Sequence, residues 1–163
     1  MIGIRRMAES GVDSARDLYN NTFRESRIKH DIAQYDDDCG VELVIPDPTS
    51  FESFQLIVEP VEGIYRDQHF VFEVSVPEFF PNEPYKLRLL TPIFHPNIDQ
   101  EGHVCLNILR RDWSPSIDLT QIACSLQFLL AEPNPDDPLN EEAARLYKMD
   151  IASFIDRAQK KQD

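Results

Sequence analysis

Several residue types and patterns are scarce in this 163-residue chain, and each scarcity excludes a class of protein. The three cysteines, Cys39, Cys105 and Cys124, include no CxxC pair, so neither a disulfide framework nor a structural zinc site is expected. No apolar run approaches the ~18 residues that a membrane helix needs. The opening residues, MIGIRRMAES, hold too few apolar residues for a signal peptide. These absences favour a soluble protein of a reducing compartment, expected in the cytoplasm and nucleus, with no membrane partner.

Basic residues are also scarce, with 16 Lys and Arg against 29 Asp and Glu and a net charge of −13. Nucleic acid is therefore not an expected partner, because its phosphates would repel the chain. Residues 1–30 differ from the rest, since they hold six basic and four acidic side chains. A basic end on an acidic body predicts a docking surface for an acidic protein, although a solvated helix face would show the same pattern.

Hydrophobic residues make up 42% of the chain, which fits a single globular domain of this length. Residues 1–13 are expected to form a flexible N-terminal docking tail, and residues 14–163 the core domain. A proline-free run from Asp13 to Tyr35 predicts a helix. Alternating apolar residues and intervening turn residues predict an antiparallel meander of four strands. The expected strands are 41–45, 54–59, 69–76 and 86–90.

Residues 91–117 show little periodicity, and an irregular stretch of that length inside a compact domain is usually functional. A helix follows, with apolar residues at helical spacing from Leu119 to Leu130 and Asp118 as its cap. Asn140 is expected to cap a short helix, and a last helix covers about 150–160. The order of elements predicts an α+β fold.

The stretch HPNIDQEGHVC, from His95 to Cys105, stands out within the irregular segment. Cys124 lies in an apolar helical pattern and Cys39 begins a strand-like run, so both are expected to be buried. Cys105 lies among polar loop residues instead. One hypothesis is a metal site of His95, His103 and Cys105, but this spacing matches no zinc pattern and we expect no metal. A second is a Cys–His nucleophile, although no third group that would orient the histidine is evident.

A third hypothesis makes the Cys105 thiol an acyl carrier. A thiolate can accept an acyl group as a thioester, which stays reactive toward an amine. The attack by the amine forms an oxyanion, and an asparagine amide such as that of Asn97 can donate a hydrogen bond to it. A carboxylate from the acidic loop EPNPDDP could orient the incoming lysine. This chemistry needs neither a metal nor a strong histidine base.

The residues that carry this third hypothesis resemble the ubiquitin-conjugating enzyme family. HPN is followed, eight positions after its asparagine, by the cysteine of VCLNILRRDWSP, and the likeness continues through EPNPDDPLNEEAARLY. Upstream, EPVEGIYRDQHFVFEVSVPEFFPNEPYKL is similar to the family's second and third strands and its proline loop. The resemblance covers about residues 24–160. HPNID-x-EG-x-VCLNILR and DPLN-x-EAA are most similar to the neddylation branch, which attaches a ubiquitin-like modifier to cullins.

The resemblance implies roles for single residues at the site. Cys105 would carry the thioester, and Asn97 would either stabilise the oxyanion or brace the loop. Asp137, 32 positions after the cysteine, matches the family's lysine-gating aspartate. Asn107 would line the same opening of the active site. His95 is expected to be structural. No cofactor is implied, because the activating enzyme consumes the ATP.

The resemblance also implies partners: a ubiquitin-like modifier, a heterodimeric activating enzyme, a RING-type ligase with a co-ligase, and a cullin substrate. Three sets of docking residues follow. Activating-enzyme docking is expected at Ile4, Met7, Arg24 and Arg27. Co-ligase docking is expected at Met1 and Ile2. Ligase docking is expected at Asn82, Pro84, Ser114, Pro115 and Ser116.

The first ligase loop departs from the family pattern. Pro84-Tyr85 stands where the family usually has Pro-Pro, and Asn82 stands where many ubiquitin-type members have an aromatic residue. Two other functions stay open at this point. One is the same chemistry with ubiquitin itself, and the other is a non-catalytic ubiquitin-binding module of the same fold.

Overall fold

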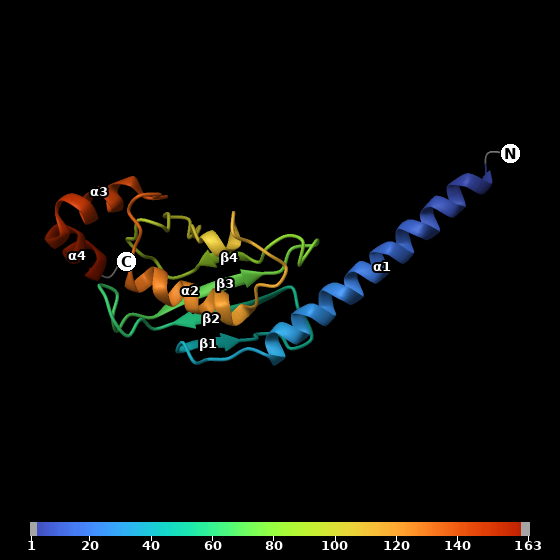
Figure 1. Ribbon diagram of the computed structural model, residues 1–163, viewed down its shortest axis with the longest axis horizontal. Coiled ribbons are helices and arrows are strands. Elements are labelled where there is room, and N and C mark those ends of the chain that lie inside the picture. The colour runs from blue at the N-terminus through green and yellow to red at the C-terminus, as the bar shows by residue number, and fades with distance from the viewer. Residues whose placement is uncertain (1–2, 161–163) are drawn as a thin grey trace.

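The structure, a computed structural model, describes the backbone of residues 3–160 and the side chains of residues 18–160. A four-stranded sheet forms the body, helix α1 (Gly3–Ala33) projects from one end, and α3 (Glu141–Met149) and α4 (Ile151–Gln159) lie at the other (Figure 1). Among the described residues, no helix has both the length and the apolar character that crossing a membrane requires.

The sheet is the antiparallel meander that the sequence predicts. Its strands are β1 (Val41–Val44), β2 (Ser53–Val58), β3 (Phe70–Ser75) and β4 (Lys86–Leu89), and they neighbour one another in chain order. Buried side chains of β2 and β3 stand directly opposite one another, as in the pair Leu56 and Phe72. Burial of such a side chain contributes roughly 1.5–3 kcal/mol, so the period-two pattern fixes this register. The expected α+β fold is confirmed.

Helix α2 (Leu119–Ala131) packs its apolar face against β1 and β2. The carboxylate of Asp118 accepts from the backbone N–H of Gln121, and the Gln121 side chain accepts from the N–H of Asp118. This capping box starts the helix where the sequence predicts. Asn140 caps α3 in the expected way, through a hydrogen bond from the N–H of Ala143.

Two expectations about the elements are wrong. Helix α1 begins at Gly3, not near Asp13, so residues 3–13 continue the helix. Gly11 lowers helix propensity by only about 1 kcal/mol, and the helix formers around it outweigh that cost. Cys124 is exposed, because it lies outside the i, i+3, i+4 series of buried residues on α2. A separate docking role for residues 1–13 stays a prediction.

Candidate active site

The stretch from His95 to Cys105 folds back on itself as a tight hairpin. The N–H of Asp99 donates to the carbonyl of His103, and the N–H of Cys105 donates to the carbonyl of Asn97 at 2.9 Å. An isolated bridge between Ile98 and Val104 lies between these two bonds. The backbone of Cys105 is thereby fixed opposite Asn97, which explains their spacing in the sequence.

Gly102 makes this hairpin possible. Its φ is +84°, and a Cβ at this position would lie 2.2 Å from the carbonyl oxygen of Leu89. The Gly102 carbonyl in turn accepts from the N–H of Leu89 at 2.8 Å. Only a residue without a side chain fits both the backbone conformation and this approach, so the hairpin is held directly against β4.

His95 is structural, as expected from the sequence. It is fully buried, its Nε2 donates to the carbonyl of Leu129 at 3.1 Å, and its Nδ1 accepts from the N–H of Asn97 at 2.9 Å. The neutral ring satisfies both contacts. Burial lowers the pKa of His95 to about 4, although the bond to Leu129 opposes the shift. The imidazole therefore links the hairpin to α2.

The Asn97 amide braces the loop that follows α2. It is 2% exposed, and its Nδ2 donates to the carbonyls of Asn134 at 2.7 Å and Asp137 at 3.3 Å. Its Oδ1 accepts from the N–H of Asn134 at 2.8 Å. Of the two roles expected for Asn97, this geometry is that of the brace, because both amide hydrogens are already donated.

Two further hydrogen bonds join the same segments. The N–H groups of Leu139 and Asn140 both donate to the carbonyl of Pro96, at 2.9 Å and 3.0 Å. The irregular loop between α2 and α3 is thus fastened to Pro96 and Asn97 of the HPN motif. This contact brings Asp137 to the cysteine from far along the chain.

A groove of about 420 Å³ opens at Cys105 and contains all four residues expected in the catalytic site. Cys105, Asn97, Asn107 and Asp137 line it, together with the exposed Phe128 of α2. Asn107 begins the short helix η1 (Asn107–Leu109), and its Oδ1 accepts from Arg111 at 3.3 Å. The roles of these residues remain predictions, but their proximity is observed.

Arg110 is a residue of this site that the sequence reasoning missed. Its Nη1 lies 2.6 Å from Cys105 Sγ and 3.9 Å from Asp137 Oδ2. An arginine five positions after a predicted carrier cysteine, at the end of a short turn, is the signal that could have indicated it. The neighbouring Asp136 faces Lys148 instead, with 2.7 Å between Oδ1 and Nζ.

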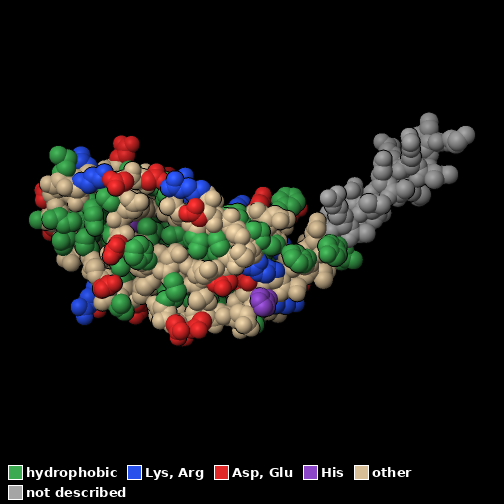
Figure 2. Space-filling view, viewed as in Figure 1, with side chains coloured by type: hydrophobic (Ala, Val, Ile, Leu, Met, Phe, Trp, Pro, Cys, Tyr) green, Lys and Arg blue, Asp and Glu red, His purple; other side chains and the backbone are tan. Residues whose placement is uncertain are grey.

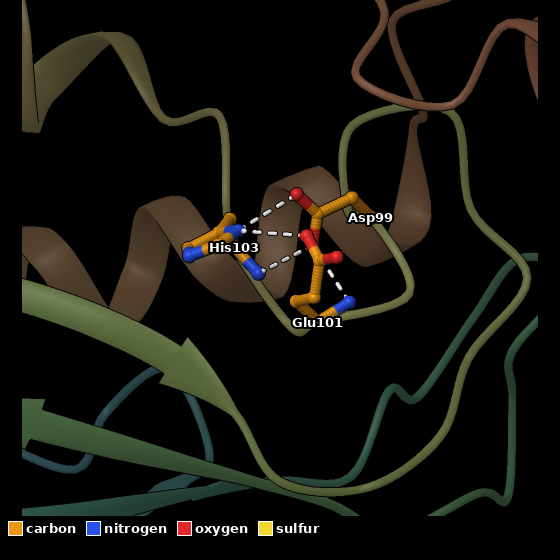
Figure 3. Close-up of side chains that lie close together, drawn as sticks. All are labelled: Asp99, Glu101 and His103. Atoms are coloured by element: carbon orange, nitrogen blue, oxygen red, sulfur yellow. Dashed lines mark hydrogen bonds and ion pairs between the residues drawn. The ribbon is translucent and has the colours of Figure 1, made fainter.

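The metal and Cys–His hypotheses find no support in this geometry. His103 is exposed, and its Nδ1 contacts Asp99 at 2.8 Å (Figure 3). Across the described side chains, metal-ligand spacing occurs in one group, Asp99, Glu101 and His103, which does not contain Cys105. The nitrogens of His95 face Leu129 and Asn97, so neither histidine is placed as a base for the thiol.

The two expected ligase loops lie side by side. Trp113 Nε1 donates to the carbonyl of Pro81 at 3.1 Å and joins the loop of Asn82 and Pro84 to that of Ser114, Pro115 and Ser116. Asn82, Pro115 and Ser116 are exposed. The structure therefore brings both sets together on one surface, whereas their contact with a ligase stays a prediction.

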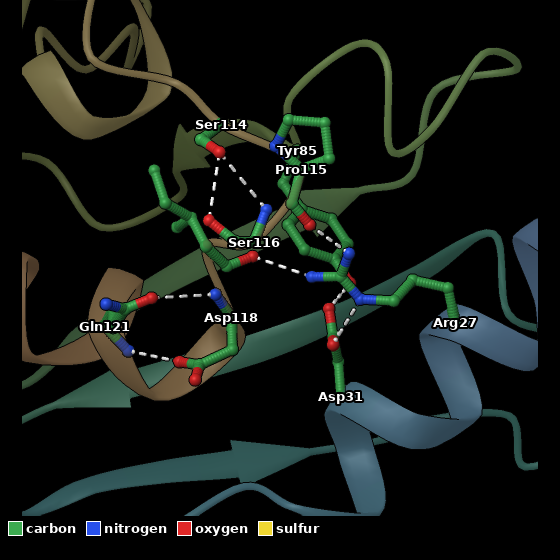
Figure 4. Close-up of polar contacts among 9 residues, drawn as sticks. Arg27, Asp31, Tyr85, Ser114, Pro115, Ser116, Asp118 and Gln121 are labelled. Atoms are coloured by element: carbon green, nitrogen blue, oxygen red, sulfur yellow. Dashed lines mark hydrogen bonds and ion pairs between the residues drawn. The ribbon is translucent and has the colours of Figure 1, made fainter.

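Arg27 and Arg24, expected to contact the activating enzyme, instead donate within the chain. Arg27 donates to the carbonyls of Pro115 and Ile117 and to Asp31, whose other carboxylate oxygen accepts from the Tyr85 hydroxyl at 2.8 Å (Figure 4). Arg24 is 8% exposed.

The Arg24 guanidinium donates to the carbonyls of Val76 and Pro77 and to both carboxylate oxygens of Glu52. With Arg27, it ties α1 to the loops beside the sheet. A direct contact of either guanidinium with a partner would have to break these internal bonds, so the expectation is not supported for these two residues.

Three exposed apolar side chains of α1 were not predicted from the sequence. Leu18, Tyr19 and Phe23 are exposed on α1. Figure 2 shows hydrophobic side chains at the surface where the helix leaves the body. These three side chains present an apolar surface on α1. The other expected docking residues, Met1, Ile2, Ile4 and Met7, lie outside the residues whose side chains the structure describes.

Comparison with known proteins agrees with the fold. The family profile described as ubiquitin-conjugating enzyme matches residues 27–162, so the chain belongs to this family. The Nedd8-conjugating enzyme UbcE2M of Drosophila melanogaster is 44% identical over 159 residues, which are 96% of this chain and 87% of that protein.

A second relative and a solved structure come from Saccharomyces cerevisiae. The NEDD8-conjugating enzyme UBC12 is 48% identical over 126 residues, 74% of this chain and 67% of the relative. The structure of S. cerevisiae Ubc12 matches with a TM-score of 0.81 at 36% identity, covering 96% of this chain and 89% of the other. The resemblance to the neddylation branch is confirmed, and the chain is a transferase that works through a thioester.

Proposed function

We propose that this chain accepts a neddylation-type modifier on Cys105 from a heterodimeric activating enzyme and transfers it to a lysine of a cullin, assisted by a RING-type ligase and a co-ligase. The observation that carries the proposal is the groove in which Cys105 and Asp137 meet. The names of the relatives support the choice of modifier. We further propose that the chain acts in the cytoplasm and nucleus.

The chemistry follows from the two groups in the groove. The Cys105 sulfur attacks the carbonyl carbon of the thioester on the activating enzyme, and the thiol of that enzyme leaves. A lysine nitrogen then attacks the new thioester carbon. The C–N bond forms, the C–S bond to Cys105 breaks, and the amine gives up a proton, whose departure a carboxylate such as Asp137 can assist. These steps need no cofactor on this chain, since the activating enzyme uses the ATP.

A charging assay tests the proposal. The chain is mixed with ATP, the neddylation activating enzyme and its modifier, and in parallel with the ubiquitin set, and both mixtures are run on reducing and non-reducing gels. A reductant-sensitive adduct with the neddylation set alone is expected. An adduct with ubiquitin alone would overturn the choice of modifier, and no adduct with either set would favour the non-catalytic binding module.

A further inference from the structure

Arg110 occupies the space between the two groups that the transfer reaction uses. One nitrogen of its guanidinium, Nη1, lies within hydrogen-bonding distance of Cys105 Sγ, at 2.6 Å, and 3.9 Å from Asp137 Oδ2. The side chain is 56% exposed, so it can leave this position without disturbing the core. It comes from the turn after η1, where the backbone N–H donates to the carbonyl of Asn107.

The two neighbouring aspartates of the acidic loop differ in how they are paired. Asp136 forms a close ion pair with Lys148 at 2.7 Å, away from the thiol. The Asp137 carboxylate is 60% exposed and has the looser contact with Arg110. Among the described side chains that form ion pairs, Arg110 is therefore the cation that an incoming amine would compete with for Asp137.

An acceptor lysine must enter this same position. Its nitrogen has to reach the carbon attached to Cys105 Sγ, and its positive charge is attracted by the Asp137 carboxylate. Before a modifier is attached to Cys105, Arg110 contacts both groups. Its guanidinium carries the same positive charge as the lysine. The guanidinium thus opposes the entry of a lysine in two ways, by competing for the carboxylate and by like-charge repulsion.

We propose that Arg110 is a gating residue that holds the acceptor position against free amines until a lysine delivered on a protein substrate displaces it. This inference rests on the proposed function, because it needs a thioester on Cys105. Its consequence is selectivity. A lysine fixed near the groove by its own protein can displace a weakly paired, exposed guanidinium, whereas a free amine at low concentration does so poorly.

The test measures discharge of the preformed thioester to free lysine as a function of lysine concentration. Arg110→Gln should reach half-maximal discharge at a lysine concentration about two- to five-fold lower than the wild type, the range expected for an exposed ion pair. The maximal rate should stay within two-fold. The shift should shrink when salt is raised from about 0.05 M to 0.5 M, because salt screens the attraction of both the guanidinium and the lysine to the Asp137 carboxylate.

Matched variants separate gating from a general effect of charge or folding. Arg66→Gln removes one exposed positive charge outside the groove and should leave the half-maximal concentration unchanged. Arg110→Lys keeps the charge and should stay closer to the wild type than Arg110→Gln does. With Asp137→Asn already present, adding Arg110→Gln should produce at most half of the shift.

Charging of each variant is recorded first, which keeps two failures distinct. Absence of a thioester on the wild type with either modifier would overturn the proposed function. Normal charging with an unchanged or higher half-maximal lysine concentration in Arg110→Gln would overturn the gate alone. A shift of equal size in Arg66→Gln, or one that high salt leaves unchanged, would also overturn it.

Discussion

Asn97 and Asn134 form a reciprocal pair across 37 positions of the chain: the side chain of Asn97 donates to the carbonyl of Asn134 and accepts from its N–H, at 2.7 Å and 2.8 Å. The Asn97 amide therefore forms hydrogen bonds with both the N–H and the carbonyl of Asn134, a residue of the acidic loop. The pairing makes the position of Asp137 depend on the HPN motif.

Asn97→Ala should consequently weaken the fold as well as the reaction. Loss of three partly buried hydrogen bonds predicts a free energy of unfolding lower by about 2–3 kcal/mol, measured by urea denaturation. Discharge of the thioester should slow because Asp137 loses its anchor. Gln100→Ala, an exposed change in the same hairpin, should leave stability unchanged. Slow discharge with wild-type stability would contradict the brace and favour an oxyanion role.

Cys105→Ser should replace the reductant-sensitive adduct by a reductant-resistant ester, or abolish charging, because a hydroxyl is a weaker nucleophile and a poorer leaving group than a thiol. Gels with and without reductant measure this. Cys39→Ser, at a cysteine outside the groove of Cys105, serves as the cysteine control for the chemistry. A reductant-sensitive adduct that survives Cys105→Ser would show that another cysteine is the carrier.

Asp137→Asn should leave charging intact and slow discharge to lysine about ten-fold or more, because the amide can neither attract the amine nor assist loss of its proton. Single-turnover discharge of the purified thioester measures the rate. Asp136→Asn is the neighbouring control, since that carboxylate faces Lys148. Equal rates for Asp137→Asn and the wild type would remove the proposed role of Asp137.

His95 should make the fold sensitive to acid. Burial holds the pKa of its imidazole at about 4, below the ~6.5 of an exposed histidine. As pH falls below ~6.5 the unfolded chain takes up a proton and the folded chain does not. The stability present at neutral pH is therefore lost progressively down to about pH 4, by on the order of 2 kcal/mol at pH 5.

Urea unfolding at pH 7.5 and pH 5 measures this loss. His95→Gln should show a smaller decrease between the two pH values, since glutamine can replace both hydrogen bonds but has no titrating ring. The same decrease in the variant and the wild type would assign the pH dependence to other groups.

Tyr85→Phe should destabilise the chain by about 1–2 kcal/mol, because the buried Asp31 carboxylate loses a hydrogen bond. Burial and the Asp31 charge raise the pKa of Tyr85 well above its usual value, so the hydroxyl keeps the proton that it donates. Thermal unfolding measures the change. Tyr19→Phe, which alters an exposed hydroxyl, is the control, and equal melting temperatures for all three proteins would show that the bond contributes nothing.

The order of elements, the strand register and the helix caps could be predicted from the sequence because each depends on neighbours along the chain. Asp118 and Gln121 are three residues apart, and the apolar residues of β3 alternate within six positions. The apolar stretch predicts a buried Cys124, but the helical period leaves one face of α2 exposed and Cys124 lies outside the buried series. Gly11 favours a helix start near Asp13, but a single glycine costs too little to end α1 there.

The site was predicted as a set of residues but not as a geometry. The spacing of Asn97 and Cys105 indicated a functional loop, and the resemblance added Asp137. The spacing of five residues between Cys105 and Arg110 allows the two side chains to meet, but the contact itself depends on the backbone turn between them. Likewise, a basic residue on a helix reads as solvent-facing, whereas Arg24 and Arg27 donate to carbonyls about 50 and 90 positions away.

The meander separates two events in folding. Each strand pairs with a strand next to it in the sequence, so the sheet can grow by successive hairpins over short loops. The contacts that fasten the acidic loop to Asn97 span 37 to 40 positions and join segments on either side of α2. We therefore expect a nascent chain to form its sheet before the groove of Cys105 and Asp137. An incompletely folded molecule would then not hold the modifier where a lysine could attack the thioester.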